Sequence, residues 1–175
     1  MMAALLESML TDRLGSGGAL VRSAGFGPEG LPPIDAAVVA MQRRGLDVSA
    51  HRSRAATAAL VDGADVIITA ERAHVVKIAA LSPSGFRRAM TLPELLDRIA
   101  DAPRDASPTS VNAWVTSLTA NRTAGVYLRE PVPEVDDPTG SMPRAFEAAV
   151  VAIQRQCTDV SEVLARITRD LHPST

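Results

Sequence analysis

The sequence predicts an α/β fold, a three-layer sandwich in which helices cover both faces of an open parallel sheet. Amphipathic helical segments alternate with short apolar runs, and glycines separate several of them. The run Val66–Thr69 is continuously apolar, which is typical of a parallel strand buried on both faces. Short connections and right-handed crossovers turn such an alternation into layers. We therefore expect parallel strands near residues 20–25, 66–70 and 87–92.

The N-terminal part of the chain predicts a helix, a strand and a loop. Residues 2–14 carry leucines at helical spacing, and the glycine-rich run 15–18 ends this helix. Residues 20–25 are expected to form a strand, and the glycines and prolines of residues 27–33 predict a loop after it. A helix followed by a glycine turn and a strand is the usual order of an α/β domain.

A second helix is predicted over residues 36–44. Its inner side should hold Val38, Val39 and Met41. Gly45 should end it, because glycine readily adopts the left-handed conformation found at helix ends. This helix is expected to pack its inner side against the rest of the domain.

The remaining elements are two helices, an elaboration and a long closing helix. Residues 57–62 and 71–81 are predicted to be helical. The proline-rich stretch 93–131 is expected to be a variable elaboration, with a helix over residues 110–120. After Pro143, apolar residues recur every three or four positions, so a long amphipathic helix should cover one face of the sheet.

Composition and charge indicate a single soluble domain over residues 1–175. Hydrophobic residues make up 46% of the chain, which is enough for a sizeable core. The formal charge of -2 gives no general attraction to nucleic acid or to anionic membranes. No apolar stretch approaches the ~20 residues of a membrane span, and the amphipathic N-terminal helix does not resemble a signal peptide. Because a single cysteine cannot form an internal disulfide, we expect a cytoplasmic protein.

Motifs in two parts of the chain carry the functional prediction. The first part combines Ser23-Ala24-Gly25 with His51-Arg52-Ser53-Arg54, and the second part is Asp136-Asp137-Pro138. In order and spacing these motifs resemble the low-molecular-weight protein tyrosine phosphatase family. The other residues that share this resemblance are Phe26, Gly30, Pro33, Asp35 and the run Arg44-Gly45-Leu46-Asp47.

The resemblance runs from Met2 to about Leu92 and resumes from Val135 to Leu164. It implies hydrolysis of phosphomonoesters through a cysteinyl-phosphate intermediate. It also implies a first central strand and a phosphate loop of the form Cys-x-x-x-x-x-Arg-Ser-Pro before the helix at residues 2–14. No such run occurs in the sequence. We therefore expect that the first central strand and the nucleophile are missing and that the chain as given is inactive.

In that family an aspartate before a proline is the general acid, which protonates the departing oxygen and then activates water. The resemblance gives this role to Asp137, with Asp136 as a solvent-exposed neighbour. Without the resemblance, the same residues would be interpreted as a turn. Tyrosine-selective members carry aromatic residues after the Asp-Pro pair, whereas this chain carries Thr139-Gly140-Ser141. The departure puts a phosphotyrosine preference in doubt.

The resemblance also gives roles to Ser23 and His51. The corresponding residues of the family form a hydrogen-bonded shell that braces the phosphate loop. A structural alternative makes Ser23 a residue at a strand end that satisfies a backbone group, and His51 a polar turn residue. The spacing of Ser23 and His51 relative to Gly45, Asp47 and Arg54 matches the family, and this favours the bracing role.

Cys157 does not meet the requirements of a nucleophile. A phosphatase thiolate sits at a helix N-terminus, with an arginine at the end of its loop to hold the phosphate. Cys157 lies instead on the apolar side of the predicted long helix, and the residue six positions later is Val163. We expect Cys157 to be a small buried hydrophobic residue.

Other chemistries find little support in the sequence. Arsenate reductases of similar fold use additional cysteines, which this chain lacks. The histidines His51, His74 and His172 are far apart in sequence, without a cluster at metal-ligand spacing. The glycines at positions 25, 27 and 30 run into prolines rather than into a helix, so they do not form a dinucleotide motif. No metal or cofactor is expected.

Three explanations of the missing loop remain open at this stage. The sequence starts at an internal methionine of a longer and active phosphatase, whose partner is a phosphorylated protein or another phosphomonoester. Alternatively, the chain is a non-catalytic pseudophosphatase that acts as a binding or regulatory module. In the third explanation it is an unrelated α/β protein with coincidental spacings.

Overall fold

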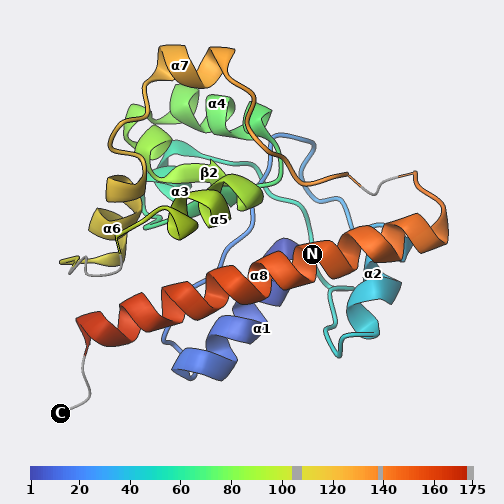
Figure 1. Ribbon diagram of the computed structural model, residues 1–175. Helices are drawn as coiled ribbons and strands as arrows, with labels where there is room; N and C mark the ends of the chain where they lie inside the picture. The colour runs from blue at the N-terminus through green and yellow to red at the C-terminus, as the bar shows by residue number, and fades with distance from the viewer. Residues whose placement is uncertain (104–107, 138–139, 173–175) are drawn as a thin grey trace. The chain divides into compact units, whose positions relative to one another are not determined.

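The computed structural model describes residues 1–103, 108–137 and 140–172, and groups the chain into two compact units (Figure 1). Unit 1 and unit 2 each combine an N-terminal with a C-terminal stretch. Unit 1 consists of Met1–Ala56 with Asp136–Ala165, and unit 2 consists of Thr57–Val135 with Arg166–Thr175.

Unit 1 begins with α1 (Met2–Leu14), which has the predicted bounds. Its leucines Leu5, Leu6 and Leu10 are buried, as their helical spacing requires. The helix ends at Gly15, whose φ of 79° lies in the left-handed region that glycine occupies without strain.

Helix α2 (Asp35–Gln42) buries a different side from the one predicted. Met41 is fully buried as expected, and Ala37 and Ala40 are buried beside it. Val39 is 46% exposed, so its expected inner position is wrong. At about 100° per residue, Val39 lies on the opposite side of the helix from the stripe formed by the two alanines and Met41.

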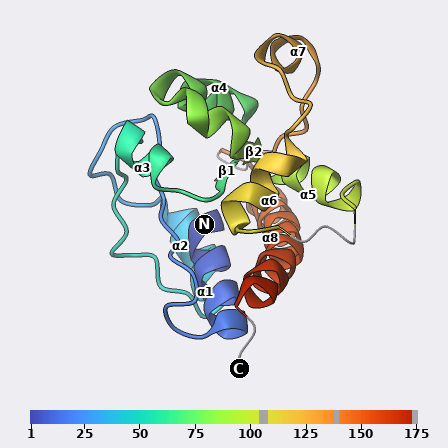
Figure 2. The same cartoon turned by 90° about the vertical axis from the view of Figure 1, so that its left-hand side faces the viewer.

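Helix α8 (Pro143–Leu171) confirms the predicted long amphipathic helix. Its N-terminal part lies alongside α2 within unit 1 (Figure 1), and α1 is seen beside α8 in Figure 2. Arg44, just after α2, donates to Glu147 and to Gln154 of α8, both at 2.7 Å. The residues that form the buried stripe of α8 in unit 1 are Phe146, Val150, Ile153, Cys157, Val160 and Leu164.

Unit 2 contains a parallel sheet of β1 (Ile67–Thr69) and β2 (Ala89–Thr91), in which Ile68 is paired with Met90. The connection between the strands is α4 (Arg72–Leu81). A 3-10 helix, η1 (Pro83–Arg87), follows it. Helix α4 lies on one side of the strands and α5 (Leu92–Ala100) on the other (Figure 1). The α/β fold with a parallel sheet is thereby confirmed.

The short helix α3 (Ala58–Asp62) packs closely against η1. A Cβ added to Gly85 of η1 would lie 2.4 Å from a side-chain carbon of Val61, so only glycine fits there. The hydroxyl of Ser82 donates to the carboxylate of Asp62 at 2.5 Å, and this bond lowers the pKa of Asp62.

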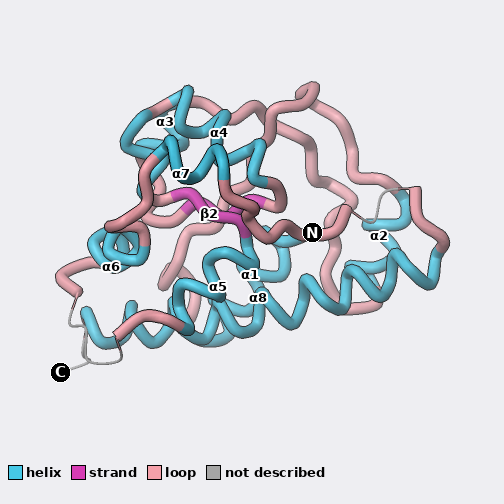
Figure 3. The backbone as a smooth tube through the Cα atoms, turned by 45° about the horizontal axis from the view of Figure 1, so that its top comes forward, coloured by secondary structure: helices cyan, strands magenta, loops and turns pink. Residues whose placement is uncertain are grey.

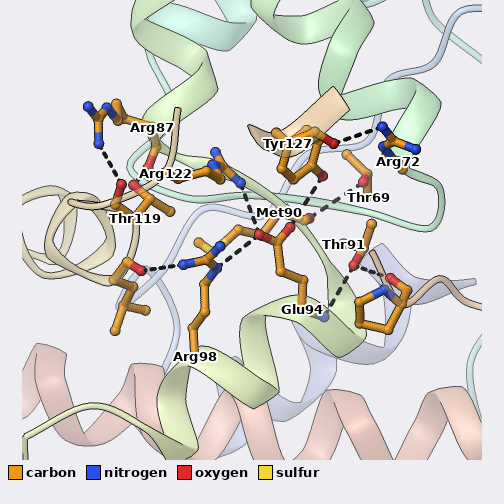
Figure 4. Close-up of polar contacts among 12 residues, drawn as sticks. Thr69, Arg72, Arg87, Met90, Thr91, Glu94, Arg98, Thr119, Arg122 and Tyr127 are labelled. Carbon is orange, nitrogen blue, oxygen red and sulfur yellow. Dashed lines mark hydrogen bonds and ion pairs between the residues drawn. The ribbon is translucent and has the colours of Figure 1, made fainter. Parts of the chain in front are cut away.

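The next three helices after the sheet each begin at a threonine or serine cap. These helices are α5, α6 (Val111–Leu118) and α7 (Ala124–Arg129). The hydroxyls of Thr91, Ser110 and Thr123 accept hydrogen bonds from backbone N–H groups of the first turns. Only α6 matches a predicted helix, whereas α5 and α7 were not expected. Buried polar side chains between these helices surround Glu94 (Figure 4).

The strand expected at residues 20–25 is wrong. Residues 20–24 form no strand, and Gly25 makes only an isolated parallel bridge with Ala55. In the described part of the chain, β1 pairs with β2 alone, and Ile67 and Ile68 are only partly buried. An extended segment becomes a strand only where a neighbouring backbone accepts and donates its ladder bonds. The expected absence of a first central strand stays a prediction.

Among the helices that the structure describes, none has both the length and the apolar character needed to cross a bilayer.

Candidate functional site

The Ser-Ala-Gly and His-x-x-Arg motifs are joined by hydrogen bonds within unit 1. The N–H of Gly25 donates to the carbonyl of Arg54 at 2.9 Å, and the N–H of Ala56 donates back to Gly25 at 2.8 Å. These bonds produce the isolated bridge between Gly25 and Ala55. Both segments belong to the long loops of the molecule (Figure 3). Motifs that are far apart in sequence are therefore held together by backbone groups.

Ser23 is held through its backbone. Its carbonyl accepts a hydrogen bond of 3.0 Å from Nε of Arg54, so the two motifs also share a side-chain contact. The side chain of Ser23 is half-buried, and its hydroxyl has no hydrogen-bond partner among the described residues.

Ser53 and Glu29 also bond the two segments, and the sequence did not single them out for this. The hydroxyl of Ser53 donates to the carbonyl of Pro28 at 2.7 Å and accepts from the N–H of Leu31 at 3.0 Å. The carboxylate of Glu29 accepts from the N–H of Ala55 at 2.8 Å. Serine and glutamate are common in exposed loops, so no sequence signal separates these two from solvated residues.

His51 lies in a turn, and its side chain is exposed. Its N–H donates to the carbonyl of Val48 at 3.0 Å, and its own carbonyl accepts from Nη1 of Arg52 at 2.7 Å. Hydrogen bonds from Ser49 lower the pKa of Asp47 at the start of the turn. The backbone conformation at His51 is therefore fixed while its ring faces solvent.

Residues 133–135, which precede Asp137 in the sequence, are bonded to the ends of the strands in unit 2. Val135 donates its N–H to the carbonyl of Ala70, the residue after β1, at 2.9 Å. The carbonyl of Pro133 accepts from the hydroxyl of Thr91 at the end of β2, at 2.6 Å. Residues 133–135 are thereby fixed at the carboxyl ends of the two strands of unit 2.

The predicted site residues Ser23, His51 and Asp137 all belong to unit 1. Both aspartates of the Asp-Asp-Pro motif are exposed. Pro138 and Thr139 lie outside the described residues. Convergence of the three predicted site residues on one point stays a prediction.

Cys157 is a buried core residue, in agreement with its position on the apolar side of α8. Burial raises the pKa of its thiol to about 12, although the N-terminal amine acts in the opposite direction. A thiol that is neutral at physiological pH and inaccessible to a phosphoester does not act as a nucleophile. Cys157 is therefore not a candidate for this role.

In the described ranges, no group of three or more histidine, cysteine, aspartate or glutamate side chains is arranged to hold a metal ion.

The family model for low molecular weight phosphotyrosine protein phosphatase matches residues 1–106, and the chain belongs to this family. The match includes Ser23 and His51 and continues beyond Leu92, where the resemblance read from the motifs lapses. No curated protein sequence matches the chain.

Solved structures of phosphatases share the fold. The YwlE arginine phosphatase from Geobacillus stearothermophilus superposes with a TM-score of 0.67 at 19% identity, covering 99% of this chain and 88% of that one. A YwlE mutant from Bacillus subtilis gives 0.64 at 19% identity, covering 93% and 87% of the two chains. The tyrosine phosphatase Wzb from Escherichia coli, in complex with sulphate, gives 0.61 at 19% identity, covering 93% and 89%.

Proposed function

We propose that this protein serves the removal of phosphate from phosphorylated proteins, with Asp137 as the general acid and Ser23 and His51 as braces of a phosphate loop. Membership of residues 1–106 in the phosphatase family is the observation that carries the proposal. A thiolate chemistry suits a reducing compartment, so we place the protein in the cytoplasm.

The reaction needs a Cys-x-x-x-x-x-Arg loop joined to these residues. The loop thiolate attacks phosphorus and forms an S–P bond while the P–O bond to the leaving group breaks, and Asp137 gives its proton to the departing oxygen. The Asp137 carboxylate then takes a proton from water, whose oxygen attacks phosphorus. The S–P bond breaks, phosphate leaves and the thiolate is restored. Ser23 and His51 touch the loop and not the substrate.

A second candidate function is a non-catalytic module that binds phosphoproteins or regulates a partner. Its support is the buried position of Cys157, the only cysteine of the sequence. Losing the nucleophile of a covalent mechanism costs many powers of ten in rate. In both cases the polypeptide of residues 1–175 is expected to show no turnover.

The substrate class follows from the residues after the proposed acid. Thr139-Gly140-Ser141 offers no aromatic side chain to flank a phosphotyrosine ring. We therefore propose a phosphorylated protein substrate without a preference for tyrosine. The structural neighbours include both arginine and tyrosine phosphatases, so the fold accommodates either chemistry.

Fusing a strand with a Cys-x-x-x-x-x-Arg-Ser-Pro loop before Met1 tests the proposal. We expect hydrolysis of an aryl phosphate by the fusion and none by residues 1–175 alone. In the fusion, Asp137→Asn should lower kcat by ~10²- to 10⁴-fold, the usual contribution of a general acid. Asp136→Asn is the matched control and should retain most of the activity. A folded but inactive fusion would favour the non-catalytic module, and activity of residues 1–175 that survives Cys157→Ala would overturn the mechanism.

A further inference from the structure

The segment of unit 1 that precedes α3 is an extended chain with bonded neighbours on both edges. On one edge, the carbonyl of Arg54 and the N–H of Ala56 bond to the backbone of Gly25. On the other edge, the backbone of Ser53 bonds to residues 30 and 31. Backbone groups that alternate between two edges belong to a strand-like conformation, in which successive side chains point to opposite faces. One face of this segment is therefore turned outward.

The exposure of the side chains follows the same alternation in both bonded segments. Ser23 and Ser53 are partly buried, and the residues on either side of each serine are exposed. The bridge between Gly25 and Ala55 aligns the two segments in parallel, so their exposed positions share one side. We call this side the arginine face, and its residues are Arg22, Ala24, Arg52 and Arg54.

Backbone carbonyls orient two of these arginines. Nε of Arg54 donates to the carbonyl of Ser23 at 3.0 Å. Nη1 of Arg52 donates to the carbonyls of Ser49 and His51, at 3.0 and 2.7 Å. A carbonyl fixes a guanidinium without neutralising its charge, and the remaining N–H groups stay open to solvent. Donors that are already oriented lose less conformational entropy when they bind a partner.

The positive charge of the arginine face is not compensated within the described residues. None of its three arginines forms an ion pair there. Glu29 is the one acidic residue of the ranges 20–31 and 48–56, and its carboxylate accepts from the N–H of Ala55, on the edge away from Gly25. Hydrogen bonds, and not an arginine, lower the pKa of the nearby Asp47. Three positive charges thus stand together on a chain whose formal charge is -2.

The spacing of the arginines matches carboxylates on an extended peptide. Arg52 and Arg54 are two residues apart on an extended chain, which places their Cα atoms ~6.6 Å apart. Acidic residues at every second position of an extended partner have the same spacing. A nucleic acid suits the face less well, because Ala24 and the arginines offer no aromatic ring on which a base could stack.

We propose that the arginine face binds an extended acidic segment of a partner protein, in which aspartate or glutamate recurs at every second position. The partner's carboxylates accept charge-assisted hydrogen bonds from Arg22, Arg52 and Arg54. The proposal goes beyond the phosphatase function and does not depend on it, because it involves no reacting group.

Fluorescence anisotropy of labelled peptides with purified residues 1–175 tests the proposal. The probe peptide carries four glutamates that alternate with serines. It should bind, and binding should weaken several-fold when the salt concentration is raised from ~0.05 to ~0.3 M, because exposed charges are screened. A peptide with glutamine in place of glutamate should not bind. A peptide with the four glutamates in one run has the same charge and should bind several-fold more weakly.

Variants of the protein provide the matched comparison. The side chain of Arg22 makes no hydrogen bond to the described residues, so its replacement leaves the local structure intact, which circular dichroism checks. Arg22→Gln should weaken binding by ~2- to 5-fold, the usual effect of one exposed ion pair. Arg22→Glu combined with Arg52→Glu should abolish binding, and Arg22→Lys should retain most of it. Arg155→Glu changes the charge of an exposed arginine on α8 and should leave binding unchanged.

Four outcomes would overturn the proposal. The first is that the alternating glutamate peptide does not bind to the unmodified chain. The second is that Arg155→Glu weakens binding as much as Arg22→Glu, which would show a general effect of net charge. The third is that the folded double variant Arg22→Glu with Arg52→Glu binds normally, which would place the peptide elsewhere. The fourth is that a single-stranded oligonucleotide binds more tightly than the peptide at the same salt concentration, which would make the partner a nucleic acid.

Discussion

Glu94 is a buried carboxylate that three side chains of unit 2 share. One oxygen accepts from Arg98 at 2.9 Å and from Arg122 at 3.2 Å, and the other accepts from the hydroxyl of Tyr127 at 3.3 Å (Figure 4). Burial, with a further contribution from Glu94, raises the pKa of Tyr127 well above its usual value. The guanidinium of Arg122 also lies 4.2 Å from the ring centre of Phe86. The cluster therefore depends on one negative charge.

Replacing Glu94→Gln should lower the free energy of unfolding by about 3 to 5 kcal/mol, because Arg122 would remain buried without its counter-charge. Urea denaturation followed by circular dichroism measures this loss. The double variant Glu94→Gln with Arg122→Met should regain a large part of it, since no unpaired charge is then buried. A loss below about 1 kcal/mol in the single variant would show that the ion pair is not essential to unit 2.

At the scale of elements, Glu147 links α8 to the end of α2. The hydrogen bond from Arg44 is the main cause that lowers the pKa of Glu147. A carboxylate whose pKa is lowered on folding stabilises the protein above its unfolded pKa, and this contribution is lost as the pH falls through the folded pKa.

Glu147→Gln should therefore cost about 0.5 to 1 kcal/mol at neutral pH, the usual range for a partly exposed pair. The difference from the wild-type chain should shrink as the pH is lowered from ~7 to ~3, because the wild-type carboxylate becomes protonated. Glu7→Gln, at an exposed position of α1, is the control and should change little at either pH. An equal loss for Glu147→Gln at both pH values would exclude the charge as its source.

The elements that could be predicted are those whose signal is local. The apolar periodicity of α1 and α8 sets which side each helix buries, so bounds and core residues followed from the sequence. The segment at residues 20–25 could not be predicted, because a strand requires a partner and the described chain offers Gly25 only a bridge. Helix α5 was missed because it starts directly after β2, where an apolar run continues from strand into helix.

In the candidate site, too, some features could be predicted from local sequence and others depend on how distant segments meet. Spacing was enough to associate the Ser-Ala-Gly and His-x-x-Arg motifs, and the bond between Arg54 and Ser23 joins them. The contributions of Ser53 and Glu29 depend on how two loops meet, which no local pattern of polar residues records. Sequence reasoning therefore associated these two segments but not the contacts that fix them.

For the whole molecule, the exposed edge of the sheet is the main expected cause of aggregation. In the described residues β1 has a paired strand on one side only, and Ile67 and Ile68 are partly exposed. An unpaired apolar strand edge presents free backbone N–H and C=O groups to other chains. We expect residues 1–175 to associate at high concentration and to unfold irreversibly on heating.

A charge at this edge should reduce the association, because lysine on an edge strand opposes pairing with another chain. Ile67→Lys should lower the aggregated fraction measured by size-exclusion chromatography and light scattering at matched protein concentration. Leu20→Lys, which changes an exposed leucine that lies outside the sheet, is the control and should leave aggregation unchanged. Circular dichroism of both variants checks that the folded fraction is equal. Should the unmodified chain instead unfold as a monomer in a sharp, reversible transition, the edge of β1 is protected and the expected absence of a central strand is wrong.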